Sequence, residues 1–127
     1  MYTPKQFQEK DREVMLQLIQ QQSFALLVTT NTEGVPIATH IPIELQTSPD
    51  GVTHLIGHVG KANPQAKLFG TNQQALAVFS GPHAYISSSW YDHINVPTWN
   101  YVSVHVYGRT RVLTEEETLE LLRNQTD

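Results

Sequence analysis

The chain contains no cysteine, which excludes disulfides, thiolate nucleophiles and cysteine-based zinc or iron–sulfur centres. Basic residues are also few, with 8 Lys and Arg against 12 Asp and Glu among 127 residues. Because duplex binding depends on clustered Lys and Arg, this balance argues against a nucleic-acid surface. No apolar run approaches the ~20 residues of a membrane-spanning helix, and the amino terminus lacks a secretory pattern. We therefore expect one cytoplasmic domain over residues 1–127 that does not associate with a membrane.

Aromatic residues are concentrated between residues 81 and 108, which hold both tryptophans and most of the tyrosines. The second half of this stretch alternates strictly, with Val102, Val104 and Val106 on one face and Tyr101, Ser103, His105 and Tyr107 on the other. One face is therefore suited to a core, and the other to a half-solvated sheet or to the wall of a flat organic ligand. Pro97 predicts a turn over residues 96–100 that presents Trp99 and Asn100.

The remaining pattern predicts short antiparallel strands joined by turns. We expect strands at residues 24–30, 35–45, 52–59, 75–80, 84–89 and 101–107, the last continuing to 113. Helices are expected at residues 11–22, 64–69 and from 114, with Asp11, Asn63 and Thr114 as their caps. Pro36 and Pro42 favour an edge, a bulge, or a place where the ladder opens toward a ligand. This order predicts an α+β, mostly β fold with a barrel or closed sheet and flanking helices.

One loop has the composition of an anion site. Residues 57–64 read Gly-His-Val-Gly-Lys-Ala-Asn-Pro, so two glycines and a lysine connect a predicted strand to a capped helix. Glycine lets backbone N–H groups approach an anion, the helix start offers free donors, and Lys61 adds a full charge. The alternative is a plain strand-to-helix connection with Asn63 as its cap, because capped turns greatly outnumber ligand sites.

The histidines and serines give weaker signals. His54 and His58 lie on a predicted strand without a nearby carboxylate, so we expect no metal site. His40 and His105 could bond either a ligand carbonyl or the backbone. The serines before Trp90 lack a Gly-x-Ser-x-Gly turn, so a hydrolase triad has little support.

Several long motifs in order resemble the PaiB family of FMN-binding proteins, often labelled negative transcriptional regulators. They are MYTPKQF at the start, ATHIPI from Ala38, GHVGKANP from Gly57, FSGPHAYISSSWY from Phe79 and VPTWNYVSVHVYG from Val96. The resemblance covers nearly the whole chain. It implies an FMN-binding split β-barrel that assembles as a homodimer with FMN at the subunit interface.

The resemblance also implies a set of cofactor-binding residues. His58, Lys61 and Asn63 would serve the phosphate and ribityl end of FMN. Thr39, His40 and Ile41 would lie along the isoalloxazine, partly through backbone groups. Trp99, Asn100 and Tyr101 would close over the ring from the same or the partner subunit.

The chain departs from the family pattern at three places. Gly60 precedes Lys61 where relatives commonly read Ala-Arg or Ala-Lys, which keeps the cation and loosens the loop. Ser88-Ser89 stands where relatives usually carry a proline, and the family runs on well beyond Asp127.

Three functions are compatible with these features. The first is a flavin-binding regulator or sensor with a DNA or other regulatory partner, because the site shows no evident acid–base pair. The second is an FMN-dependent oxidoreductase that uses NAD(P)H on a small substrate, since the isoalloxazine itself supplies hydride chemistry. The third, ranked lowest, is a haem-binding split barrel in which His40, His58 or His105 ligates iron.

Overall fold

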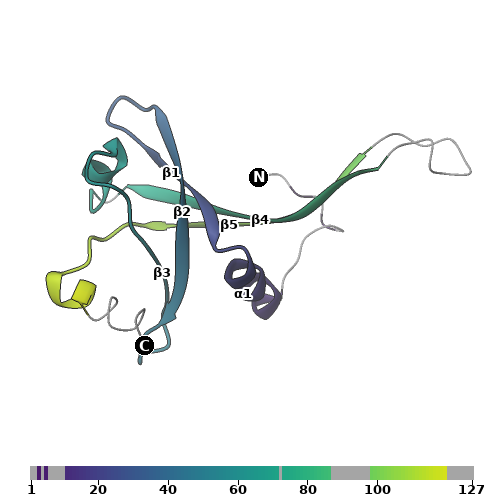
Figure 1. Cartoon of the computed structure of the whole chain (residues 1–127), viewed down its shortest axis with the longest axis horizontal. Helices are drawn as coiled ribbons and strands as arrows, with labels where there is room; N and C mark the ends of the chain where they lie inside the picture. The colour runs from purple at the N-terminus through teal and green to yellow at the C-terminus, as the bar shows by residue number, and fades with distance from the viewer. Residues whose placement is uncertain (1–2, 4, 6–10, 72, 87–97, 120–127) are drawn as a thin grey trace, which may run out of the picture.

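The computed structural model describes residues 3, 5, 11–71, 73–86 and 98–119, with the backbone alone for 83–86 and 98–100. The elements run α1 (Arg12–Gln21), β1 (Phe24–Thr30), β2 (Pro36–Thr47), β3 (Thr53–Gly57), the 3₁₀ helix η2 (Pro64–Leu68), β4 (Gln74–Ile86) and β5 (Thr98–Arg109). A helical turn follows at residues 115–119. The strands form one antiparallel sheet in the order β3-β2-β1-β4-β5. The sheet curls into a half-barrel (Figure 1), which confirms the predicted α+β, mostly β split-barrel class.

The core lies on the inner face of this curl. Strand β1 alternates strictly, so Ala25, Leu27 and Thr29 are buried while their neighbours are half-buried or exposed. Their partners across the sheet extend the same face, and α1 contributes Ile19 and the half-buried Leu16. The buried apolar set is Ile19, Ala25, Leu27, Ile41, Ile43, Ala75, Ala77 and Phe79. Phe79 is fully buried and is the largest apolar side chain in this set.

Strand β2 pairs with two different neighbours along its length. Residues Pro36–Pro42 pair with β1, whereas Ile43–Thr47 pair with β3. Pro42 lies at the point where pairing with β3 stops, because proline has no N–H to continue that ladder. Gly57 ends β3 beside this proline, where an added Cβ would lie 3.0 Å from the Pro42 carbonyl oxygen. Of the alternatives expected at the two prolines, an end of the ladder is observed at Pro42, and a ligand at this opening stays a prediction.

The helix boundaries follow the predicted caps. Asp11 accepts a hydrogen bond from the backbone N–H of Glu13 at 2.9 Å and begins α1. Asn63 accepts from the N–H of Gln65 at 2.9 Å and begins η2, with Pro64 in the first position. Both starts confirm the sequence prediction. None of the helices in the described part of the chain is long and apolar enough to span a membrane.

Two predictions about the aromatic stretch are wrong. The strands expected at residues 75–80 and 84–89 form one strand, β4, which has an irregularity between Ser80 and His83. Gly81 lies within this irregularity, and α1 packs closely there, since a Cβ on Gly81 would meet Leu18 Cδ1 at 3.0 Å. Gly81 thus permits close contact with the helix instead of reversing the chain.

The turn expected over residues 96–100 is also replaced by strand from Thr98 onward. Trp99 pairs with Tyr85, and Asn100 pairs with Ala84. Strand β5 then ends at Arg109, short of the expected residue 113. Residues 87–97, which include Ser88, Ser89 and Pro97, lie outside the described residues.

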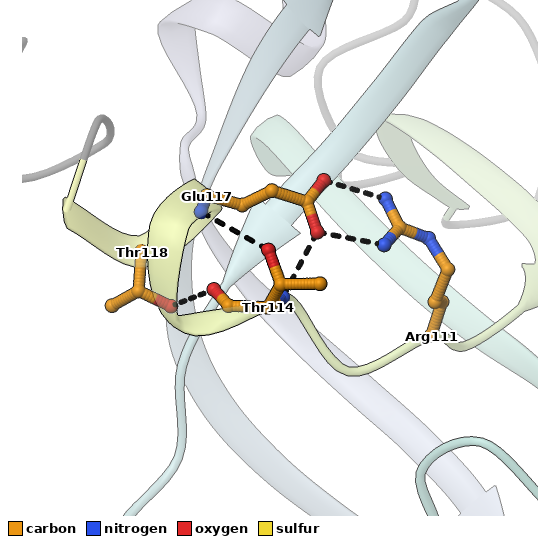
Figure 2. A network of polar contacts seen from close by, with 4 residues as sticks. All are labelled: Arg111, Thr114, Glu117 and Thr118. Atoms are coloured by element: carbon orange, nitrogen blue, oxygen red, sulfur yellow. Dashed lines mark hydrogen bonds and ion pairs between the residues drawn. The ribbon is translucent and has the colours of Figure 1, made fainter.

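The predicted capping box at Thr114 is confirmed. The backbone N–H of Glu117 donates to Thr114 Oγ1 at 3.2 Å, and the Thr114 N–H donates to Glu117 Oε1 at 2.9 Å. Arg111 adds two hydrogen bonds to the same carboxylate at 2.9 and 3.0 Å, as Figure 2 shows. The guanidinium lowers the pKa of Glu117 to about 2. The continuation of this helix past Leu119 lies outside the described residues.

Candidate functional site

Residues 57–63, from the last residue of β3 to the cap of η2, form a largely exposed corner that we call the cradle. The Asn63 N–H donates to the Gly60 carbonyl at 3.0 Å, which closes a tight turn around Lys61 and Ala62. Lys61 and His58 are exposed, and an added Cβ at Gly60 would meet no atom within 4 Å. The cradle therefore exposes the Lys61 ammonium together with the neighbouring backbone at Gly60. Because η2 is a short 3₁₀ helix, its dipole adds little, and Lys61 is the main source of positive charge.

Two predicted site residues meet at the cradle. Asn63 Nδ2 donates to Thr39 Oγ1 at 3.0 Å, so the loop is tied to the middle of β2. The Asn63 carbonyl oxygen Oδ1 is already used by the Gln65 N–H. Thr39 accepts in this contact, which leaves its own O–H proton for a further acceptor. Asn63 thus holds the loop in place, and Thr39 can still donate to a ligand.

Sequence reasoning missed Gln65, which lies directly behind the cradle. Its side chain is fully buried beneath η2, although glutamine is mostly an exposed residue. Its amide nitrogen lies within hydrogen-bond distance of the Leu27 carbonyl, the Thr29 hydroxyl and the Ile37 carbonyl. A polar residue at the first turn of a short helix gives no signal of burial. Only the half-apolar neighbourhood of residues 62–69 could have suggested it.

The backbone of β2 offers hydrogen-bonding groups beside the cradle. The backbone groups of Val35 and Ile43 face β1. The Asn31 N–H donates to the Val35 carbonyl, and the Ile43 N–H donates to the Ser23 carbonyl. Ser48 bonds the other way, toward Val52. Backbone N–H and C=O groups alternate sides along an antiparallel strand, so those of Ala38 and His40 point toward the β3 side. In the described residues, β3 pairing begins only at Ile43, which leaves these groups open to a ligand.

The three consecutive residues predicted along the isoalloxazine differ in what they expose. Ile41 is buried in the core at 8% exposure, and by the same alternation its backbone groups face β1. His40 lies on the outer face, where its ring stacks on Phe24 at a centroid distance of 5.7 Å. Thr39 is half-buried on the inner face. The Thr39 hydroxyl and the His40 backbone can therefore contact a ligand. The Ile41 side chain is packed in the core and cannot.

Trp99, Asn100 and Tyr101 lie far from the cradle in the same chain. The register places Thr39 in one cross-strand row with Leu27, Ala77 and Val106. Trp99 precedes Val106 by about seven residues, roughly 23 Å of strand, and β5 lies three strands away from β2. Figure 1 shows this end of the β4–β5 hairpin extending away from the body of the sheet. Tyr101 is 60% exposed.

The outer face of the sheet is apolar as well. Leu26, Val28, Leu76 and Val78 fill its centre, each half-buried. Cross-strand pairing joins Leu26 and Val78 in one row, which ends at His40 and His105. It joins Val28 and Leu76 in a second row, which ends at Ala38 and Tyr107. The Nδ1 atom of His105 is buried and has no hydrogen-bond partner among the described residues. A sheet with apolar side chains on both faces, and with exposed residues at Ala38, His40 and Tyr107 on the outer one, is suited to association.

A hollow of about 780 Å³ lies elsewhere, between the β2–β3 hairpin and residues 109–117. Its lining is mostly polar and includes Asp50, His54, Arg109, Arg111 and Glu117. None of the predicted cofactor-binding residues lines it. Within the described residues, no three His, Asp or Glu side chains are grouped as a metal site would require.

The sequence of this chain matches a known family. The whole chain, residues 1–127, matches the family described as "Putative FMN-binding domain". It is 44% identical to Protease synthase and sporulation protein PAI 2 of Bacillus subtilis strain 168 over 122 residues, 96% of this chain and 58% of that protein. It is 32% identical to the uncharacterized protein YKL070W of Saccharomyces cerevisiae over 97 residues, 71% of this chain and 57% of that protein.

A third relative is the uncharacterized protein AN0679 of Emericella nidulans, 28% identical over 160 residues that cover this whole chain and 64% of that protein. The chain therefore spans about three fifths of the length of these curated relatives. The PAI 2 match confirms the resemblance carried by the sequence motifs. This chain belongs to the family of FMN-binding domains, the PaiB family.

Proposed function

We propose that this chain binds FMN as a homodimer and acts as a regulatory domain of the PaiB type, with each flavin held between two subunits. The observation that carries the proposal is the separation of the cradle from Trp99 and Tyr101 within one chain. A ribityl tail of about six single bonds spans only roughly 7 Å. One FMN can therefore use both ends of the sheet only when a second copy supplies the aromatic end.

The phosphate end of FMN is assigned to the cradle. The Lys61 ammonium and the backbone around Gly60 are exposed and can face a doubly charged phosphate. The hydroxyl of Thr39 and the exposed His58 are available to the ribityl oxygens. Asn63 supports this end from behind, because both ends of its amide are bonded to Thr39 and Gln65.

The ring end is assigned to the open edge of β2 and the partner's hairpin. Paired N–H and C=O groups of Ala38 and His40 match a heteroaromatic edge that carries both donors and acceptors. Trp99, Asn100 and Tyr101 of the second copy would cover the ring. When bound, the isoalloxazine supplies redox chemistry, and these residues bind it, orient it and exclude water.

The dimer is supported by two uncovered features. The outer face is apolar at its centre, where Leu26, Val28, Leu76 and Val78 of the two middle strands lie. From His83 outward, β4 pairs only with β5 within the described residues, and an isolated two-stranded hairpin is marginal in water. A twofold partner would bury the face and support both hairpins at once.

A regulatory role agrees with the relatives and with the chemistry of the site. The relative from Bacillus subtilis is named for protease synthesis and sporulation. None of the residues assigned to FMN is a carboxylate, so the assigned set contains no acid–base partner for His40 or His58. With a net charge of -4, this domain fits a regulator whose contacts are to protein, or to DNA through other parts of a longer chain.

Complementation between two variants tests the shared site. Lys61→Ala and Tyr101→Ala proteins are purified separately, mixed under dissociating conditions and reassembled with FMN. A site shared between subunits gives heterodimers with one intact site, so about half of the heterodimer sites bind FMN with wild-type affinity. A site contained in one chain gives none. Flavin fluorescence titration measures the fraction, and each variant reassembled alone is the control.

The absorption spectrum of the wild-type protein separates the competing functions. Flavin bands support the proposal, and a Soret band would replace it with haem binding. Anaerobic reduction of bound FMN by NADH or NADPH, with turnover of an electron acceptor, would replace regulation with oxidoreductase activity.

A further inference from the structure

Gln65 is a fully buried polar side chain to which neither the motifs nor the family match assign a role. It lies two residues after Asn63, on the first turn of η2, and points into the inner face of the sheet. Most glutamines are exposed, and the polar atoms of a buried one are usually hydrogen-bonded. Its surroundings therefore decide whether it fills space or holds a neighbouring element in position.

The amide nitrogen of Gln65 connects η2 to two strands at once. It lies 3.1 Å from the Leu27 carbonyl of β1 and 2.6 Å from the Ile37 carbonyl of β2. The Thr29 hydroxyl, at 3.0 Å, is a third acceptor for a group with only two hydrogens. These contacts fix the position of the helix on the sheet as well as its distance from β2.

The amide orientation is fixed by its partners. Exchanging the nitrogen and oxygen would place Oε1 against two carbonyl oxygens, so the –NH₂ group must face β1 and β2. The remaining Oε1 atom is buried and has no partner among the described residues. A glutamate would repel both carbonyls, whereas a methionine would fill the space without holding the strands.

The contacts of Gln65 continue directly into the cradle. Its backbone N–H donates to Asn63 Oδ1, and Asn63 Nδ2 donates to Thr39. The cradle turn closes on Asn63 through the Gly60 carbonyl. We propose that Gln65 is a positioning residue for the anion-binding cradle, which sets the distance of Lys61 from Thr39 without touching the ligand. This inference rests on the assignment of the cradle to the FMN phosphate.

The test compares FMN with riboflavin, which carries the same ring and ribityl chain without the phosphate. In Gln65→Met protein, we expect FMN affinity to fall about tenfold while riboflavin affinity changes less than twofold. A purely structural role would weaken both ligands equally. Titration by flavin fluorescence gives both affinities, and circular dichroism of the flavin-free protein checks that the fold is retained.

Two further variants, one expected to weaken FMN binding less than Gln65→Met and one expected to weaken it more, test the same proposal. Thr29→Val removes one acceptor of the amide and retains the shape, so a smaller loss confined to FMN is expected even if Gln65→Met does not fold. Gln65→Glu should weaken FMN further, and Gln17→Glu, on the exposed side of α1, is the matched charge control. Equal losses for FMN and riboflavin, or an unchanged FMN affinity in folded Gln65→Met, would overturn the proposal.

Failure of this inference can be distinguished from failure of the proposed function. If Lys61→Ala removes the preference for FMN over riboflavin and Gln65→Met does not, the cradle binds phosphate without help from Gln65. If neither variant alters the preference of a protein that binds FMN, the phosphate lies elsewhere and the assignment of the cradle is wrong.

Discussion

The corner at Asn63 and the outer β4–β5 hairpin are built in opposite ways. At the corner, one chain supplies every contact: Gln65 is fully buried, and Asn63 is bonded on both sides. At the hairpin, Tyr101 is 60% and Val102 53% exposed, and β4 pairs only with β5 in the described residues. The corner is complete in one chain, whereas the hairpin exposes aromatic and apolar groups that a monomer does not need.

This difference shows how the work of binding a two-ended cofactor can be divided. A charged phosphate requires fixed donors, because electrostatic and hydrogen-bond contacts depend on exact spacing. A flat ring requires area, which an exposed aromatic strand from another copy can supply. The corner therefore supplies donors in fixed positions, and the hairpin supplies contact area. Variants at the two regions should accordingly differ in whether they affect folding or assembly.

The largest expected effect is at Phe79, which follows the last residue of β4 that pairs with β1. Phe79→Ala removes the largest fully buried apolar side chain and should lower the free energy of unfolding by about 3–5 kcal/mol. Urea denaturation of the flavin-free protein measures the change. A loss below about 1 kcal/mol would contradict the inner face as the core.

Loss of the cradle cation is next in size and acts on binding. Lys61→Ala should weaken FMN by about 1.5–3 kcal/mol, because a charge-assisted contact to phosphate is lost, and should leave thermal stability unchanged. Raising the salt concentration should reduce the difference between the variant and the wild type. Lys67→Ala, an exposed lysine at the end of η2, is the control and should bind normally. Equal losses in both variants would indicate a general charge effect.

The sequence predicted the fold well where the local signals agreed. Caps at Asp11 and Asn63, the strand at residues 24–30 and the turn that follows it each depend on neighbouring residues, and all are confirmed. Pro42 was also interpretable, because its missing N–H has the same consequence in any sheet. These features needed no knowledge of distant parts of the chain.

The wrong predictions depended on partners far away in sequence. The strands at residues 75–80 and 84–89 were predicted as separate because the helix that packs against Gly81, through Leu18, cannot be inferred from the neighbouring residues. Residues 98–100 were assigned to a turn because their pairing partners lie in β4. Gln65 was missed for the same reason, since its acceptors belong to β1 and β2. Of the predicted site, Thr39 and Asn63 were both named from the sequence but assigned to different ends of the cofactor, and the hydrogen bond between them required the structure.

A smaller effect on folding is expected at the hairpin. Tyr101→Ala should change the free energy of unfolding of the monomer by no more than about 0.5 kcal/mol, because the side chain is mostly exposed. The same change should weaken self-association, which sedimentation at a series of concentrations measures. Leu119→Ala, at another exposed apolar position, is the control and should do neither. A large loss of monomer stability would show that the hairpin is packed within its own chain.

The smallest effect is expected from a polar contact that lies outside both regions and faces solvent. The pKa of Glu117 is lowered to about 2 from its usual 4.5, chiefly by the hydrogen bonds from Arg111. A carboxyl group with a lowered pKa stabilises the folded state above its unfolded pKa, and this stabilisation is lost as the pH falls from about 4.5 toward 2. Thermal melts of the wild type and Glu117→Gln should therefore differ slightly at pH 7 and converge near pH 2. Arg111 is well exposed, so solvent screening keeps the difference small. Glu115→Gln, in the same helical turn, is the control, and a pH-dependent difference as large in that variant would assign the effect to the general charge of the helix start.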